Sequence, residues 1–113
     1  MTRDEATRSI GRSDSRQDVL NVLADPTSRA ILQLISEQTL TATEVAEKMD
    51  VPPSTVYRKL DQLIDTPLVE ATYRLKSDGK HPRQYQCTVD RVRIQMADMN
   101  DGMLQVYVSE PSG

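Results

Sequence analysis

Apolar residues recur at helical spacing through the first part of the chain. Those between residues 16 and 24 lie on one side of a short predicted helix. Asp25 followed by Pro26 predicts the start of a second helix, because the carboxylate caps free N–H groups and proline fits the first helical position. The apolar face of this second helix, about three turns long, is formed by Ala30, Ile31, Leu34 and Ile35.

Two further helices are predicted after an extended link at residues 38–40. Thr41 and Glu44 form the T-x-x-E capping box of a third helix, which runs through Met49. The prolines in segment 50–53 interrupt it, and a fourth helix is expected over residues 53–64. Its apolar face carries Val56, Leu60, Leu63 and Ile64, its polar face Ser54, Thr55, Arg58 and Gln62, and its flanks Tyr57 and Lys59.

Past Pro67 the apolar period changes from helical to alternating. Segments 69–76 and 84–89 predict two strands, separated by a turn-rich basic loop at residues 77–82. The expected inner faces carry Val69, Ala71, Tyr73 and Leu75 on the first strand, and Tyr85, Cys87 and Val89 on the second.

Alternation also predicts a second hairpin over residues 91–109. A three-residue loop at residues 100–102, with Gly102 in the left-handed conformation, would pair Met96 with Val106 and Ile94 with Val108. That register keeps all the strong hydrophobic residues on one face, whereas a two-residue loop would scatter them over both.

These elements predict an α+β fold: a winged helix-turn-helix of four helices and a β-hairpin wing, with an additional C-terminal β-hairpin. The polar segment 1–14 is expected to be a flexible arm, followed by the winged helix-turn-helix domain at 15–90. The hairpin at 91–109 is expected to serve packing or dimerisation, and residues 110–113 form a tail.

Charge is distributed unevenly along the chain. The net charge is −3, but residues 54–85 carry six positive and four negative side chains, which leaves −5 for the rest. The excess of positive charge therefore lies on the fourth helix and the wing, where a nucleic acid would bind.

The composition bears on the cellular setting. Ten Arg against four Lys, and eleven Asp against six Glu, are typical of an acidic protein of a salt-loving archaeon, whose charged surface resists aggregation. Cys87 is the single cysteine, which fits a reducing cytoplasm and is expected to be a small buried hydrophobic residue. No apolar run is long enough to cross a membrane, and the N-terminal segment does not read as a secretory signal.

The stretch LTATEVAEKMDVPPSTVYRKLDQLIDTPLV resembles the helix-turn-helix of ArsR-type winged-helix regulators, and the resemblance extends over residues 17–89. Within it, TATEVAEKM is similar to the positioning helix, STVYRKLDQL to the recognition helix and SDGKHPRQYQ to the wing. Pro52-Pro53 and Thr66-Pro67 depart from the family pattern at element ends, and the cysteine-containing metal-sensing motif is absent. The resemblance implies a DNA-binding transcription regulator, to which the family's metal sensing is not carried over, and the composition adds the expectation of a haloarchaeal type.

The polar face of the fourth helix suits the major groove of double-stranded DNA, where Arg pairs with guanine and Gln with adenine. The wing at 77–83 supplies cations that can reach the DNA backbone or the minor groove. The predicted DNA-binding residues are Ser54, Thr55, Tyr57, Arg58, Lys59, Gln62, Lys80, His81 and Arg83.

The C-terminal hairpin has an apolar face and is too small to be stable alone, so this face must bury against the chain's own wing and helices or against a second subunit. We expect a homodimer that uses it. The ArsR resemblance adds the first helix to the dimer contacts. The predicted dimerisation residues are Val19, Leu20, Val22, Leu23, Val92, Ile94, Met96, Leu104, Val106 and Val108.

The sequence does not indicate an enzyme, a cofactor, a metal site or a particular effector. It has no Gly-rich phosphate loop, no nucleophile with a plausible base, and its one histidine lies in a loop. The alternative function is a winged-helix protein-interaction module of the transcription machinery, without direct readout of bases.

Overall fold

The computed structural model describes residues 6–10, 13–96 and 104–111. Its helical part consists of α1 (Ser13–Ala24), α2 (Pro26–Glu37), α3 (Ala42–Met49) and α4 (Pro53–Ile64). Asp25 caps α2, with its carboxylate 2.9 Å from both the backbone nitrogen and the hydroxyl of Ser28. Thr41 and Glu44 form the reciprocal capping box of α3. Both predicted helix starts are therefore confirmed.

The turn between α3 and α4 is built from backbone contacts. Asp50 takes the left-handed conformation, with φ 58°, and its N–H donates to Ala46 O at 2.9 Å. Pro52 stands at the start of α4 without a side-chain cap, and its carbonyl accepts from Thr55 N at 3.0 Å. The prolines thus end the turn and begin the helix, as the sequence predicts.

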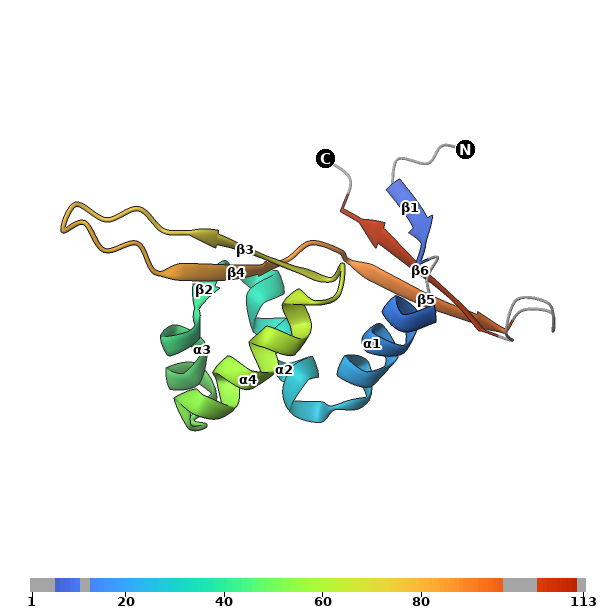
Figure 1. Ribbon diagram of the computed structural model, residues 1–113, viewed down its shortest axis with the longest axis horizontal. Coiled ribbons are helices and arrows are strands. Elements are labelled where there is room, and N and C mark those ends of the chain that lie inside the picture. The colour runs from blue at the N-terminus through green and yellow to red at the C-terminus, as the bar shows by residue number, and fades with distance from the viewer. Residues whose placement is uncertain (1–5, 11–12, 97–103, 112–113) are drawn as a thin grey trace.

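The wing is a three-stranded antiparallel sheet in the order β2-β4-β3, formed by β2 (Leu40–Thr41), β3 (Val69–Tyr73) and β4 (Arg83–Cys87). Strand β3 ends three residues before the predicted Lys76. Tyr73 is 63% exposed and Leu75 is 80% exposed, so the expected inner face is wrong beyond Ala71. The hairpin extends past the helices at that end of the molecule, where no core lies beneath it (Figure 1).

A second antiparallel sheet has the order β1-β6-β5, formed by β1 (Ala6–Ser9), β5 (Arg91–Met96) and β6 (Leu104–Glu110). Strand β1 pairs with β6, and Ile10 is buried, so the expectation of a flexible arm is wrong for residues 6–10. Segment 6–9 has no apolar alternation, so the sequence pattern does not indicate a strand that is held by backbone pairing to β6.

The C-terminal hairpin is confirmed, but its predicted register is wrong by two residues. Ile94 pairs with Val106 and Met96 with Leu104. A shift of two residues leaves every side chain on the same face, so the hydrophobic pattern could not distinguish the two registers. The predicted loop at Asn100-Asp101-Gly102 lies outside the described residues.

One continuous core links the two sheets through the helices. It includes Ile31, Ile35, Val56, Leu60 and Leu63 of helices α2 and α4, each at most 1% exposed. It continues to Val19 of α1 and to Val106 and Val108 of β6, which are fully buried. The molecule is elongated, 53 × 32 × 20 Å, with the wing at one end and β1-β6-β5 toward the other (Figure 1). The α+β winged helix-turn-helix with an added C-terminal hairpin is confirmed.

Candidate nucleic-acid interface

Helix α4 presents a polar face to solvent along its N-terminal half. Val56, Leu60 and Leu63 are fully buried and anchor the helix on the core. Arg58 lies opposite this anchor and is exposed, as is Ser54 one turn before it, and Thr55 beside them is half-buried. Tyr57 is 50% exposed on the flank that faces the wing. The structure therefore places four of the predicted residues near the start of one helix.

The other flank of α4 is occupied by contacts within the protein. The Lys59 ammonium is 3.0 Å from the Asp25 carboxylate, and the Lys59 side chain is only 17% exposed. The hydrogen bond from Lys59 and those from Ser28 hold the pKa of Asp25 below its ordinary value. Gln62 is exposed but borders a hollow between α1 and α4 that Asp18 and Asp65 also line. We therefore leave Lys59 out of the candidate interface and place Gln62 at its margin.

The tip of the wing is closed by its own hydrogen bonds. Gly79 has φ +83°, a value that favours glycine, and its N–H donates to Lys76 O at 3.2 Å. The Asp78 carboxylate accepts from Lys80 N at 3.0 Å, and His81 Nδ1 accepts from Lys76 N at 3.3 Å. His81 thus shapes the turn, while the side chains of Lys76 and Lys80 remain exposed.

Arg74 joins the wing to the helix-turn-helix. Its guanidinium donates to both Glu44 carboxylate oxygens, at 2.9 and 3.1 Å, and to the Gln84 side chain at 3.0 Å. Glu44 also accepts from Thr41 N at 2.9 Å, so the same carboxylate caps α3 and holds the wing. The Arg74 hydrogen bonds lower the pKa of Glu44 from 4.5 to about 2.

Sequence reasoning counted Arg74 only as part of the basic segment and missed this role. Its partner lies 30 residues away in the chain, so no local pattern could indicate the contact. The one available signal was the glutamate of the capping box, which has a second oxygen free to accept.

These contacts change the charge of the candidate interface. Two of the six cations in segment 54–85, Lys59 and Arg74, are neutralised by acids from outside that segment. In the described part of the chain, the cations without an ion pair in this segment are Arg58, Lys76, Lys80 and Arg83. Arg83 instead lies over the Tyr85 ring, at 5.6 Å from its centroid.

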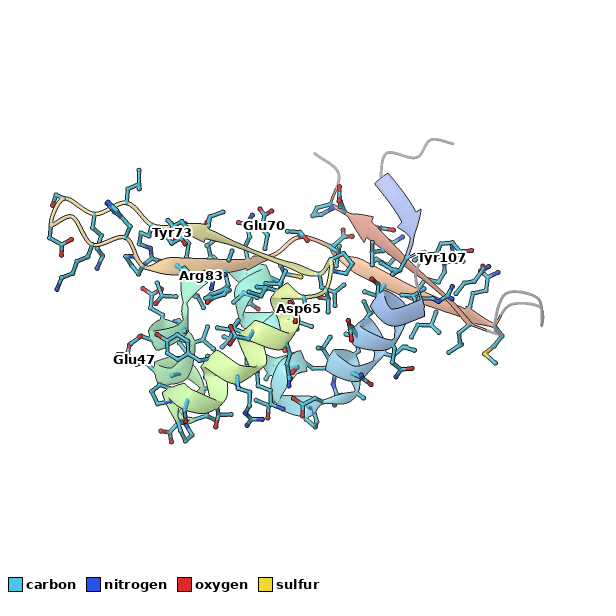
Figure 2. All side chains as sticks on the ribbon, in the orientation of Figure 1. Glu47, Asp65, Glu70, Tyr73, Arg83 and Tyr107 are labelled. Atoms are coloured by element: carbon cyan, nitrogen blue, oxygen red, sulfur yellow. The ribbon has the colours of Figure 1, made fainter. Side chains whose placement is uncertain are left out.

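A cleft of about 570 Å³ separates α3 and α4 from the wing. Arg74, Lys76 and Arg83 line it from the wing, and Glu44, Glu47 and Asp61 line it from the helices. Figure 2 shows Glu47 and Arg83 at the same end of the molecule as the wing, with Tyr107 far away in the second sheet. The cleft itself therefore has mixed charge, and the unpaired cations stand at the wing and at the outer face of α4.

The predicted dimerisation residues separate into two groups. Val19, Val22, Val106 and Val108 are at most 5% exposed within the single chain, so they are not available to a partner. Ile94 and Met96 are 48% and 70% exposed. The remaining four, Leu20, Leu23, Val92 and Leu104, are half-buried.

Among the described residues, no group of three or more His, Cys, Asp or Glu side chains is arranged to hold a metal ion. None of the described helices has the length and apolar character needed to span a membrane.

Residues 23–72 match the sequence model of a protein family described as "Helix-turn-helix domain". The matched range runs from the end of α1 to β3 and so contains α2, α3 and α4. A search of curated proteins finds no match. The family match, together with the fold, supports a DNA-binding regulator of transcription built on a helix-turn-helix.

Proposed function

We propose that the protein is a sequence-specific DNA-binding transcription regulator of the ArsR-like winged-helix type. The N-terminal half of α4 enters the major groove of double-stranded DNA, and the wing tip contacts the backbone or the minor groove. The observation that carries the proposal is the exposed, unpaired Arg58 opposite the buried face of α4, at the centre of the polar face.

The residues divide by the chemistry that they offer. Arg58 can donate two parallel hydrogen bonds to guanine, and the hydroxyls of Ser54, Thr55 and Tyr57 can bind base edges or phosphates. Lys80, His81 and Arg83 lie on the wing, with Lys76 as an additional cation beside them. Because lysine and arginine on a loop meet phosphates without reading bases, they supply affinity and orientation.

The arginine and aspartate bias supports a protein that works in concentrated salt inside a haloarchaeal cell. In such salt, counterion release contributes little to DNA affinity, because it falls with the logarithm of salt concentration. The few unpaired cations of the interface can therefore support specific DNA binding only if base contacts and packing supply much of the binding free energy.

The second candidate is a winged-helix module that binds another protein of the transcription machinery. The mixed charge of the cleft between α4 and the wing, with Glu47 and Asp61 on the helices, favours this alternative. Such a surface would repel phosphate at two points and could pair with a partner carrying both signs of charge.

Selection of bound duplexes from a random DNA library, carried out in concentrated KCl, separates the two functions. If the protein is a sequence-specific regulator, the wild type should enrich one sequence motif and Arg58→Ala should lose this enrichment. The matched control is Arg29→Ala, an exposed arginine on α2 away from α4 and the wing, whose guanidinium donates to Leu23 O at 2.8 Å and whose loss is checked for folding by circular dichroism. Absence of any enriched motif with folded wild-type protein would contradict base readout and favour the interaction module.

A further inference from the structure

Strand β5 is an open edge of the second sheet. It pairs with β6 on one side, in an unbroken register from Arg91–Ser109 to Met96–Leu104, and no other described strand pairs with it. Its six residues contain no proline and no lysine, two residues that proteins use to block such edges, and its two arginines, Arg91 and Arg93, lie on the face opposite Ile94 and Met96. Ile94 and Met96 lie exposed on it, so the edge offers an apolar strip beside backbone groups that pair with no described strand on that side.

The sequence of this strand is complementary to itself. Val92, Ile94 and Met96 share one face, and Arg93 and Gln95 lie on the other. If two copies pair antiparallel with Ile94 against Ile94, Val92 meets Met96 on one face and Arg93 meets Gln95 on the other. Centring the pair on Arg93 would instead place two like charges directly opposite each other, which is destabilising.

A neighbouring hollow fits the same arrangement. It has a volume of about 310 Å³, lies between α2 and the start of β5, and is lined largely by Leu23, Leu32, Leu68, Cys87 and Val92. Directly opposed side chains in antiparallel strands have Cβ atoms about 5 Å apart. A Met96 side chain opposite Val92 therefore reaches this hollow, and methionine is unbranched and adapts to irregular apolar space.

We propose that β5 pairs antiparallel with β5 of a second copy of this chain, around a two-fold axis at Ile94. The two sheets become one sheet of six strands, and each Met96 enters the hollow beside Val92 of the other copy. The pairing deepens the proposed function by naming how two recognition helices are joined, although it rests on residues outside the DNA-contacting face.

The first test measures mass in the absence of DNA, by size-exclusion chromatography with light scattering in concentrated KCl. Wild type is expected at about twice the chain mass of 12.7 kDa, and Ile94→Lys at a single chain mass, because two ammonium groups would face each other at the axis. Leu75→Lys is the matched control, since it changes an exposed leucine of the wing and should leave the dimer intact. A monomeric wild type, or a dimeric Ile94→Lys with an unchanged circular dichroism spectrum, overturns the proposal.

The second test reads the register by oxidative cross-linking in a Cys87→Ser background. Ile94→Cys is expected to form a disulfide-linked dimer alone. Val92→Cys and Met96→Cys are expected to cross-link only when the two variants are mixed, because Val92 of one copy lies opposite Met96 of the other. Two copies of the same variant would hold their cysteines four residues apart along the strands, about 13 Å. Cross-linking of Arg93→Cys but not of Ile94→Cys overturns this register.

Failure of this pairing and failure of the proposed function are distinguishable. Both tests use protein without DNA, whereas DNA binding is measured separately on the Ile94→Lys monomer. If the monomeric Ile94→Lys variant still enriches a half-site motif, the proposed DNA-binding function holds whatever the outcome for the β5 pairing. If the wild type is a dimer that enriches no motif, the β5 pairing holds and the proposed function fails.

Discussion

Glu44 performs two tasks with one carboxylate, since it caps α3 through Thr41 and receives the guanidinium of Arg74 from the wing. Because both bonds require the ionised form, the pKa of Glu44 in the folded protein falls to about 2, below the ordinary 4.5. The stabilisation is therefore fully present above pH 4.5 and is lost as the pH falls toward 2.

Wild-type protein is thus expected to lose unfolding free energy between pH 4.5 and pH 2, and Glu44→Gln to lose less over the same range. Denaturant titrations at a series of pH values measure this difference. Glu47→Gln is the matched control, because Glu47 is exposed on the same helix and makes no ion pair in the described structure. Parallel curves for wild type and Glu44→Gln would contradict the role given to the carboxylate.

Cys87 lies half-buried with its thiol 3.2 Å from Val89 O, and burial raises its pKa above the ordinary value. The protonated thiol donates to this carbonyl, and a serine hydroxyl can keep the same bond. Cys87→Ser is therefore expected to cost about 1 kcal/mol of unfolding free energy, the lower end of the range for a hydroxyl placed in a largely apolar site.

The same geometry predicts that DNA binding is insensitive to mild peroxide, because the thiol is mostly protonated and the thiolate is the reactive form. Binding titrations before and after peroxide, on wild type and Cys87→Ser, measure this. Loss of binding in wild type alone would identify Cys87 as an oxidation sensor.

At the scale of elements, Arg74 sets the position of the wing relative to α3 and α4. Arg74→Ala should weaken binding to all DNA sequences, although its guanidinium is directed at Glu44 and not at the DNA. Because the two residues act as a pair, Glu44→Ala with Arg74→Ala should lose no more affinity than either single variant. Fluorescence anisotropy titrations of the three variants test this, and additive losses would show that the residues act independently.

Much of the helical part of the fold follows from local signals. Asp25-Pro26, the Thr41–Glu44 capping box and the prolines at 52–53 each specify a helix end through contacts within four residues. The hairpin register was predicted wrongly, because a shift of two residues leaves the same faces apolar, and strand β1 was missed because β6 alone holds it.

The candidate site was predictable where exposure follows from helical periodicity, as for Arg58 and Tyr57. It was not predictable where side chains find partners across the fold. Lys59 binds Asp25 and Arg74 binds Glu44, and both acids lie outside the segment whose charge was counted. Ion pairs between residues far apart in the chain cannot be predicted from the composition of one segment.

At the scale of the whole molecule, the wing and the second sheet lie toward opposite ends of an elongated body (Figure 1). If a two-fold dimer joined at β5 binds one duplex with both of its recognition helices, the two helices contact half-sites related by the same axis. The enriched DNA motif is therefore expected to be an inverted repeat whose half-site centres are separated by about 10 base pairs or a multiple of this. A single asymmetric motif bound by a dimeric protein would contradict this arrangement.

In the proposed regulator, α4 reads bases while the wing holds the backbone. A comparison of Arg58→Ala with Arg83→Ala, on the selected duplex and on a scrambled duplex of the same length, tests this division of roles. Arg58→Ala should lose about 1–3 kcal/mol on the selected duplex and little on the scrambled one, because a bidentate contact to a base is removed. Arg83→Ala should weaken both duplexes alike and reduce the salt dependence by about one unit. Equal losses on both duplexes for Arg58→Ala would contradict base reading by α4.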